Sequence, residues 1–383
     1  MSHLPYETPP APGQPRYHRA LHVLALLTAC ATFPLIFMGG LVTSHQAGMS
    51  VPDWPNSYGY NMFLFPPRLW IGGILYEHTH RLMGTVVGLL SILLAAVAWR
   101  VEERRPVRWL AIGVLGAVIF QGVLGGLRVV LVKLDLAIVH ACFAQAFFCL
   151  AALVALVTSR GWIERSQRQE ANLAGRGRAL VRLAIVAVVM VYLQLVVGAV
   201  MRHYQAGLAI PDFPLSYGKV LPPTDAAALQ AANAMRHADV TLNPVTIGQV
   251  WIHFAHRIGA LLVTMVIVGL AGVVIRKHRK QPELMGPAII LVILLIAQIT
   301  LGIVTVLWRK PADVASAHVA VGALVLLTAF VLCVRAIRLD GMTSAAITVA
   351  PHLEGSRTGR PRGITSGDES FSPVQSSTSQ ASA

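Results

Sequence analysis

The chain has 383 residues, of which 55% are hydrophobic and only 13% are charged. Soluble proteins carry about 25% charged residues, so this composition excludes disorder and argues against an ordinary soluble domain. A net charge of +14 can indicate nucleic-acid binding, but in a chain this apolar it favours basic cytoplasmic loops of a membrane protein. The four cysteines lie in apolar runs without metal-site spacing, so neither a disulfide framework nor a zinc site is predicted.

Eight segments are long and apolar enough to cross a bilayer, which takes about 20 residues of helix. They are expected at 21–43, 78–99, 109–130, 136–158, 180–201, 250–275, 286–307 and 313–335. The first is longer than the apolar region of a typical signal peptide, so we interpret it as a retained membrane helix. The predicted fold is an all-α polytopic membrane protein with eight transmembrane helices.

Lysine and arginine residues set the predicted orientation, because cytoplasmic loops carry an excess of them. With a cytoplasmic N-terminus, the inner regions hold 21 of the 31 Lys and Arg residues. Both termini are therefore expected in the cytoplasm. The segment after Asp340 is rich in Ser, Thr, Gly and Pro and is predicted to be disordered, since it cannot bury enough apolar surface.

Two outer loops nearly repeat each other: residues 52–59 read PDWPNSYG and residues 211–218 read PDFPLSYG. Because four helices separate them, both halves run the same way through the membrane, and we predict two four-helix bundles as a tandem parallel repeat. The second loop carries an insertion at 224–243, in which 226–234 can form a short helix. The predicted parts are an N-terminal cytoplasmic segment 1–20, an N-terminal half 21–158, a cytoplasmic linker 159–179, a C-terminal half 180–335 and a disordered tail 336–383.

A Gln-x-x-x-Gly pattern recurs in three of the spans. Glycine lets helices approach closely and glutamine can form hydrogen bonds across them, so we interpret the pattern as helix packing. It occurs at Gln121/Gly125, Gln194/Gly198 and Gln298/Gly302.

Four histidines lie in the first part of an even-numbered span, two in each half: His80, His140, His256 and His318. All even spans start on the outer side, so the four imidazoles are expected at similar depth in the outer leaflet. An ionisable residue inside a bilayer is costly and usually functional. Two imidazoles facing each other in a four-helix bundle suit heme iron, which they bind axially from opposite sides. Copper or zinc accepts the same ligand type but would need a third ligand nearby.

The halves differ three residues before the first histidine of each pair, where Glu77 corresponds to His253. A carboxylate on the same helix face as the ligand can move protons, so the first half is predicted to perform chemistry and the second to hold a redox cofactor. The alternatives are a solvated helix-start carboxylate for Glu77 and a ligand role for His253 in place of His256. Arg81 and Arg257 stand at the membrane surface, where they suit heme propionates or simply snorkel.

These motifs resemble the heme A synthase family (CtaA/Cox15 type) over about residues 20–336. The residues that carry the resemblance are Glu77-x-x-His80-Arg81, His140, His256-Arg257, His318 and the duplicated Pro-Asp-Trp/Phe-Pro loops. The resemblance implies an oxidoreductase that converts the C8 methyl of heme O to the formyl group of heme A, for terminal oxidases. Two oxygen-dependent hydroxylations with loss of water would accomplish this.

The resemblance also assigns roles to the two halves. Heme b is implied as the cofactor in the C-terminal half, with His256 and His318 as its ligands. Heme O is implied as the substrate at His80 and His140, beside a catalytic Glu77. The implied location is a bacterial-type inner membrane with the heme sites toward the outer side; membrane lipid, a heme O synthase and an unidentified electron donor are candidate partners, and nucleic acid is not. Neither outer loop contains the cysteine that many family members have there, so no loop disulfide is carried over.

Two other functions remain open at this stage. A two-heme b-type electron-transfer cytochrome explains the four histidines but leaves Glu77 without a role. A transporter built on a parallel repeat would show midplane charges and broken helices in corresponding places. The spans here show neither clearly, so the heme-modifying enzyme is the favoured hypothesis.

Overall fold

The computed structural model describes residues 16–167, 178–240 and 242–354, and its long elements in these ranges are all helices. Eight helices are long and apolar enough to cross a membrane, and each overlaps one predicted span. They are α1 (Arg19–Ser44), α2 (Gly72–Val101), α3 (Arg105–Leu131), α4 (Leu134–Val157), α6 (Arg178–His203), α8 (Ile247–Lys277), α9 (Pro282–Leu307) and α10 (Ala312–Glu354). The predicted all-α polytopic fold is therefore confirmed.

Shorter elements connect these helices: α5 (Arg160–Gln167), α7 (Ala226–Val240) and the 3-10 turns η1 (Met62–Leu64), η2 (Pro67–Leu69) and η3 (Ala206–Leu208). The short helix predicted within the 224–243 insertion is present as α7. The last helix, α10, is longer than the predicted span 313–335 and continues to Glu354. Residues 1–15, 168–177 and 355–383, on which other predicted boundaries fall, lie outside the described residues.

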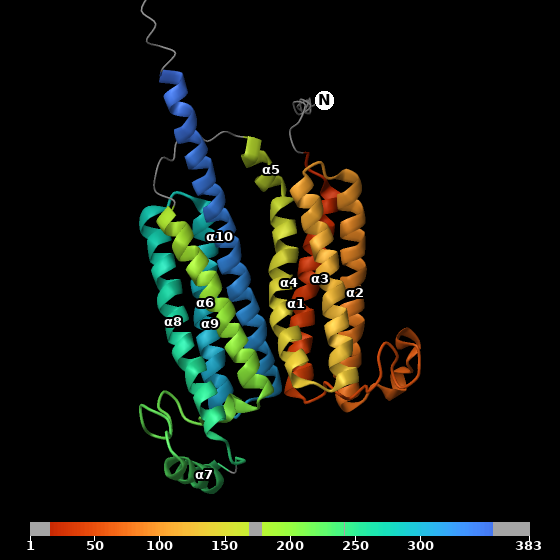
Figure 1. Cartoon of the computed structure of the whole chain (residues 1–383), viewed down its shortest axis with the longest axis vertical. Helices are drawn as coiled ribbons and strands as arrows, with labels where there is room; N and C mark the ends of the chain where they lie inside the picture. The colour runs from red at the N-terminus through yellow and green to blue at the C-terminus, as the bar shows by residue number, and fades with distance from the viewer. Residues whose placement is uncertain (1–15, 168–177, 241, 355–383) are drawn as a thin grey trace, which may run out of the picture.

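Figure 1 shows the membrane helices in two four-helix groups side by side, α1–α4 and α6 with α8–α10. Each group has its own apolar core, built around residues such as Leu94 and Val114 in the first and Ile267 and Leu291 in the second. The groups meet mainly through α1 and α10, with α4 and α6 alongside. The α1–α2 loop and α7 lie at one end of the molecule, and α5 and the end of α10 lie at the opposite end.

The outward faces of the helices are apolar. Leu261, Met265 and Ile296, for example, are each more than 60% exposed. In water such faces would be unfavourable, whereas lipid tails solvate them as well as another helix would. The exposed apolar faces thus agree with eight helices that sit in a bilayer.

A capping box fixes where α8 begins. The Thr246 hydroxyl accepts from the Gln249 backbone N–H at 3.3 Å, and the Thr246 N–H donates to Gln249 Oε1 at 2.9 Å. These contacts satisfy N–H groups that a helix start otherwise leaves unpaired. The start of α8 sets the register of His253 and His256, which follow within its first three turns.

Candidate functional site

The structure brings the four predicted histidines together as two facing pairs. His80 of α2 and His140 of α4 have ring centroids 6.5 Å apart, and His256 of α8 and His318 of α10 have centroids 6.4 Å apart. An imidazole–metal bond of about 2 Å places two rings on opposite sides of one ion at a centroid separation of roughly 6 Å. Both pairs therefore fit axial ligation of one iron each. No cluster of three or more His, Cys, Asp or Glu side chains suited to a metal occurs in the described residues.

Each of the four rings packs against a glycine of a neighbouring helix. A Cβ atom added to any of these glycines would lie 3.1–3.3 Å from the imidazole Cε1, tighter than an ordinary contact. A side chain there would displace the ring, so the glycines define where the imidazoles stand. The glycines are Gly39 of α1, Gly125 of α3, Gly198 of α6 and Gly302 of α9, facing His80, His140, His256 and His318 in that order.

The Gln-x-x-x-Gly pattern, interpreted from sequence as helix packing, thus includes three of these four glycines. Its glutamines also lie beside the histidines: Gln194 Nε2 is 3.1 Å from His256 Nδ1, and Gln121 Nε2 donates to the His140 carbonyl at 3.2 Å. The pattern packs helices, but it does so around the imidazoles. In the sequence, the Gln-x-x-x-Gly pattern recurs in the membrane helix that precedes a predicted histidine ligand. This recurrence was the signal that could have indicated contact with the imidazoles.

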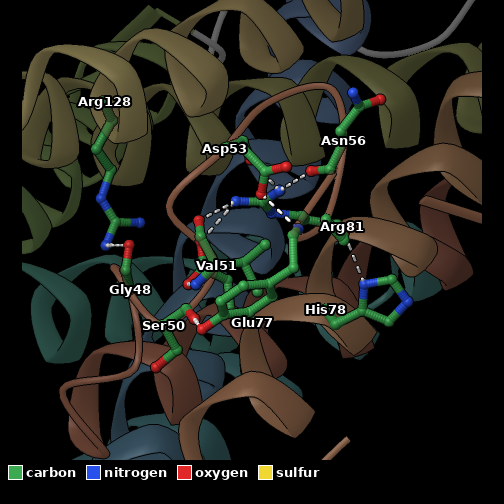
Figure 2. A network of polar contacts seen from close by, with 11 residues as sticks. Gly48, Ser50, Val51, Asp53, Asn56, Glu77, His78, Arg81 and Arg128 are labelled. Atoms are coloured by element: carbon green, nitrogen blue, oxygen red, sulfur yellow. Dashed lines mark hydrogen bonds and ion pairs between the residues drawn. The ribbon is translucent and has the colours of Figure 1, made fainter. Parts of the chain in front are cut away.

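Glu77 is 4% exposed and holds the loop between α1 and α2. Its Oε2 accepts from the Val51 N–H at 2.9 Å, and its Oε1 pairs with Arg81 Nη2 at 3.0 Å. Arg81 also donates to the carbonyl oxygens of Val51, Asp53 and Asn56, as Figure 2 shows. The predicted Glu77 and Arg81 are therefore one network that ties the start of α2 to the loop.

His253 occupies the corresponding place in the second half. The Ile210 N–H donates to its Nδ1 at 3.2 Å, and Arg257 Nε lies 3.3 Å from its Nε2. A carboxylate accepts two hydrogen bonds at once, but a neutral imidazole has a single acceptor nitrogen. His253 can thus satisfy only one of these two donors, and it brings no negative charge to Arg257. The Glu77/His253 difference noted in the sequence is a difference of charge within one shared arrangement.

The two loop arginines have partners in the protein. Arg257 donates to the carbonyl oxygens of Ile210, Asp212 and Leu215, and Arg81 binds the first loop in the same manner. The propionate role predicted for both arginines stays a prediction. Each guanidinium binds the loop of its own half, and each arginine directly follows one histidine of the pair in that half.

Asp53 shapes the first loop from within. Its carboxylate accepts from the backbone N–H groups of Tyr58 at 2.7 Å and Gly59 at 2.8 Å. Burial acts to raise the pKa of Asp53, but these backbone hydrogen bonds outweigh it, so the pKa lies below the ordinary value. Asp212 makes the same two contacts with the backbone N–H groups of Tyr217 and Gly218, so the two loops share the same local conformation.

Sequence reasoning missed two arginines that lie in the last turn of their helices. Arg128 of α3 donates to the Gly48 carbonyl at 3.2 Å. Arg202 of α6 reaches the other half, where it binds the Gly40 carbonyl and Ser44 Oγ of α1. Among the described residues neither guanidinium forms an ion pair. The signal was available for Arg128, because it lies within the predicted span 109–130 and an arginine within an apolar span is rare and usually has a specific partner. Arg202 directly follows the predicted span 180–201.

A family model described as a cytochrome oxidase assembly protein (COX15-CtaA) matches residues 73–331. The chain belongs to this family. It is 30% identical over 307 residues to the protein named heme A synthase of Halalkalibacterium halodurans, which covers 79% of this chain and 92% of that protein. The heme A synthase of Shouchella clausii is 27% identical over 76% and 88%, and that of Shewanella oneidensis is 25% identical over 80% and 93%. The heme A synthase family indicated by the motifs is thereby confirmed.

Proposed function

We propose that the protein is a heme A synthase, an oxidoreductase that converts the C8 methyl of heme O to the formyl group of heme A by successive oxygen-dependent hydroxylation. Its family membership supports the activity. The observation that carries the proposal is the presence of two facing histidine pairs, each with a glycine beside every ring. A single redox cofactor would need one such pair, and the second pair provides a place for a heme substrate.

We assign heme O to His80 and His140, and heme b to His256 and His318. The support is the charge difference between the halves, because only the first pair has a carboxylate, Glu77, on the same helix face as one ligand. When bound, heme b supplies one-electron redox chemistry. The chain positions both hemes through its histidines. A heme O synthase and an electron donor are the proposed partners.

Glu77 is proposed to hold or move a proton beside the substrate methyl. A carboxylate has about four lone-pair sites, and the Val51 N–H and Arg81 occupy two of them. Acceptor capacity therefore remains on both oxygens. Arg81 keeps the carboxylate at the loop, where the outer surface is near.

Conversion of added heme O to heme A tests this function. Purified protein incubated with heme O, a reductant and oxygen should yield heme A, which extraction and chromatography distinguish from heme O. An electron-transfer cytochrome with the same histidines would oxidise and reduce its hemes but return heme O unchanged. Recovery of unaltered heme O from protein with both sites loaded would overturn the proposal.

The eight apolar helices make this a multi-pass membrane protein. We propose the bacterial inner membrane, with both termini in the cytoplasm and the histidine pairs toward the outer side. A reporter fused after Asp340 should then be active only in a format that works in the cytoplasm. One inserted in α7, which lies at the opposite end of the molecule, should work only outside. The reverse pattern would place the sites in the inner leaflet and contradict the charge argument.

A further inference from the structure

Each helix that places a glycine against a ligand ring carries an arginine or a threonine one turn nearer the end with the α1–α2 loop and α7. Residues three or four apart lie on the same helix face, so these side chains stand beside the histidine pairs. The glycines and their followers are Gly39 and Thr43 on α1, Gly125 and Arg128 on α3, Gly198 and Arg202 on α6, and Gly302 and Thr305 on α9.

Each half thus has one arginine and one threonine, but the arginine is on a different helix in each. In the repeat, α1 corresponds to α6 and α3 to α9, so Arg128 stands where the second half has Thr305, and Arg202 where the first half has Thr43. The Thr43 hydroxyl donates to the Gly39 carbonyl at 3.1 Å, and that of Thr305 donates to a carbonyl of its own helix at 2.6 Å. The arrangement therefore provides one cation beside each histidine pair.

Arg128 lies beside the first pair without a counter-ion. Its Nη2 donates to the Gly48 carbonyl at 3.2 Å, and Figure 2 shows it away from the Glu77 and Arg81 side chains. Glu77 forms its ion pair with Arg81 at 3.0 Å, and Arg128 forms none among the described residues. A guanidinium has five N–H donors, and a charge removed from water without a partner is unfavourable. A carboxylate supplied by a ligand would offset that charge.

Arg202 lies beside the second pair. Its Nη2 donates to Ser44 Oγ at 2.6 Å, and its Nη1 lies 3.5 Å from the Ala315 carbonyl, three residues before His318. Within the part of the chain that the structure describes, it has no acidic partner. Burial and the Arg202 charge lower the pKa of Lys310, in the loop before α10, below its usual value. This end of the second half is therefore cationic.

We propose that Arg128 binds a propionate of the heme in the first half and that Arg202 binds a propionate of the heme in the second half. The inference rests on the proposed binding of heme by the histidine pairs. A planar guanidinium suits a carboxylate, which accepts two parallel N–H bonds from it. Arg81 and Arg257, predicted for this role from the sequence, each already donate to three loop carbonyls.

Heme O dimethyl ester, whose two propionates are uncharged, tests the first half. Full-length protein purified with heme b alone is titrated with heme O and with its ester, followed by absorption spectra. The parent should bind heme O about tenfold or more tightly than the ester, the usual gain from hydrogen bonds to a charged group. Arg128→Gln should bind both forms with the affinity that the parent has for the ester.

Lys133→Gln is the matched control, because it removes the same charge from an exposed side chain just beyond α3. It should keep the parent's preference for heme O. Equal affinity of the parent for heme O and its ester would overturn the inference without any variant. A preference that survives in Arg128→Gln but is lost in Arg81→Gln would also overturn it. If Arg128→Gln does not fold, Arg128→Lys decides, since it keeps the charge without the planar donors and should show a reduced preference.

Release of heme b to apomyoglobin tests the second half. Arg202→Gln should release heme b about tenfold faster than the parent, whereas Lys219→Gln, at an exposed position of the second loop, should not. When both are reconstituted with heme b dimethyl ester, Arg202→Gln and the parent should release it at the same rate. Faster release of the ester by Arg202→Gln would show that Arg202 acts only by holding α1, and would overturn its assignment. Failure of the parent to bind heme O at His80 and His140 would instead overturn the proposed function.

Discussion

Replacing His256 or His318 with alanine should leave the purified protein without its tightly bound b-type heme. The two rings face each other at 6.4 Å between centroids, and a methyl group supplies no axial nitrogen to replace either one. The heme content per protein chain should fall close to half of the parent value when heme O is supplied, and to nearly none when it is withheld. Pyridine hemochrome spectra measure both quantities and identify the heme that remains.

His253→Ala is the matched control for this experiment. His253 lies one helical turn before His256, but its nitrogens face the Ile210 N–H and Arg257 rather than His318. The variant should therefore keep its heme, with a low-spin spectrum like that of the parent. Full heme in both His256→Ala and His318→Ala would show that the ligand assignment is wrong. Loss of heme in His253→Ala alone would make His253 the ligand.

The membrane helices and the histidine pairs could be predicted from the sequence. Both depend on the length of the apolar runs and on the positions of the histidines within them. Eight apolar runs of sufficient length leave few alternatives to eight helices. The even-numbered spans all start on the same side, so His80 and His140, like His256 and His318, had to lie at similar depth. Facing each other required only that the two helices lie diagonally opposite in a four-helix group, and the ring centroids 6.5 and 6.4 Å apart agree with this.

The contacts around these histidines could not be predicted, since they depend on how loops and helices meet. The loop after α1 folds back so that the Val51 N–H reaches Glu77, and nothing in the local sequence fixes that distance. Arg202 acts across the two halves, on Gly40 and Ser44 of α1. The apolar run 313–335 also marks only part of α10, because the helix continues to Glu354.

The two roles of Glu77, loop support and proton transfer, lead to different expectations. As a loop support, Glu77 matters through Val51 and Arg81. Arg81→Ala would then impair the protein as much as any change at Glu77, because Arg81 also binds the Asp53 and Asn56 carbonyls. As a proton carrier, the carboxylate matters in itself, and a variant that preserves the loop should still be inactive.

Glu77→Gln should slow the conversion of heme O by roughly 10²–10⁴-fold, the usual contribution of a positioned acid or base. The glutamine keeps the shape and one acceptor for the Val51 N–H, but it loses the charge and the proton-accepting oxygen. Heme b should stay bound, since His256 and His318 lie in the other half, and heme O or a hydroxymethyl heme should accumulate. Arg81→Ala, which keeps the carboxylate, should lower thermal stability more than Glu77→Gln and turnover per folded protein less. Normal heme A production by Glu77→Gln would leave Glu77 as a loop support alone, because the carboxylate would then be dispensable for the reaction.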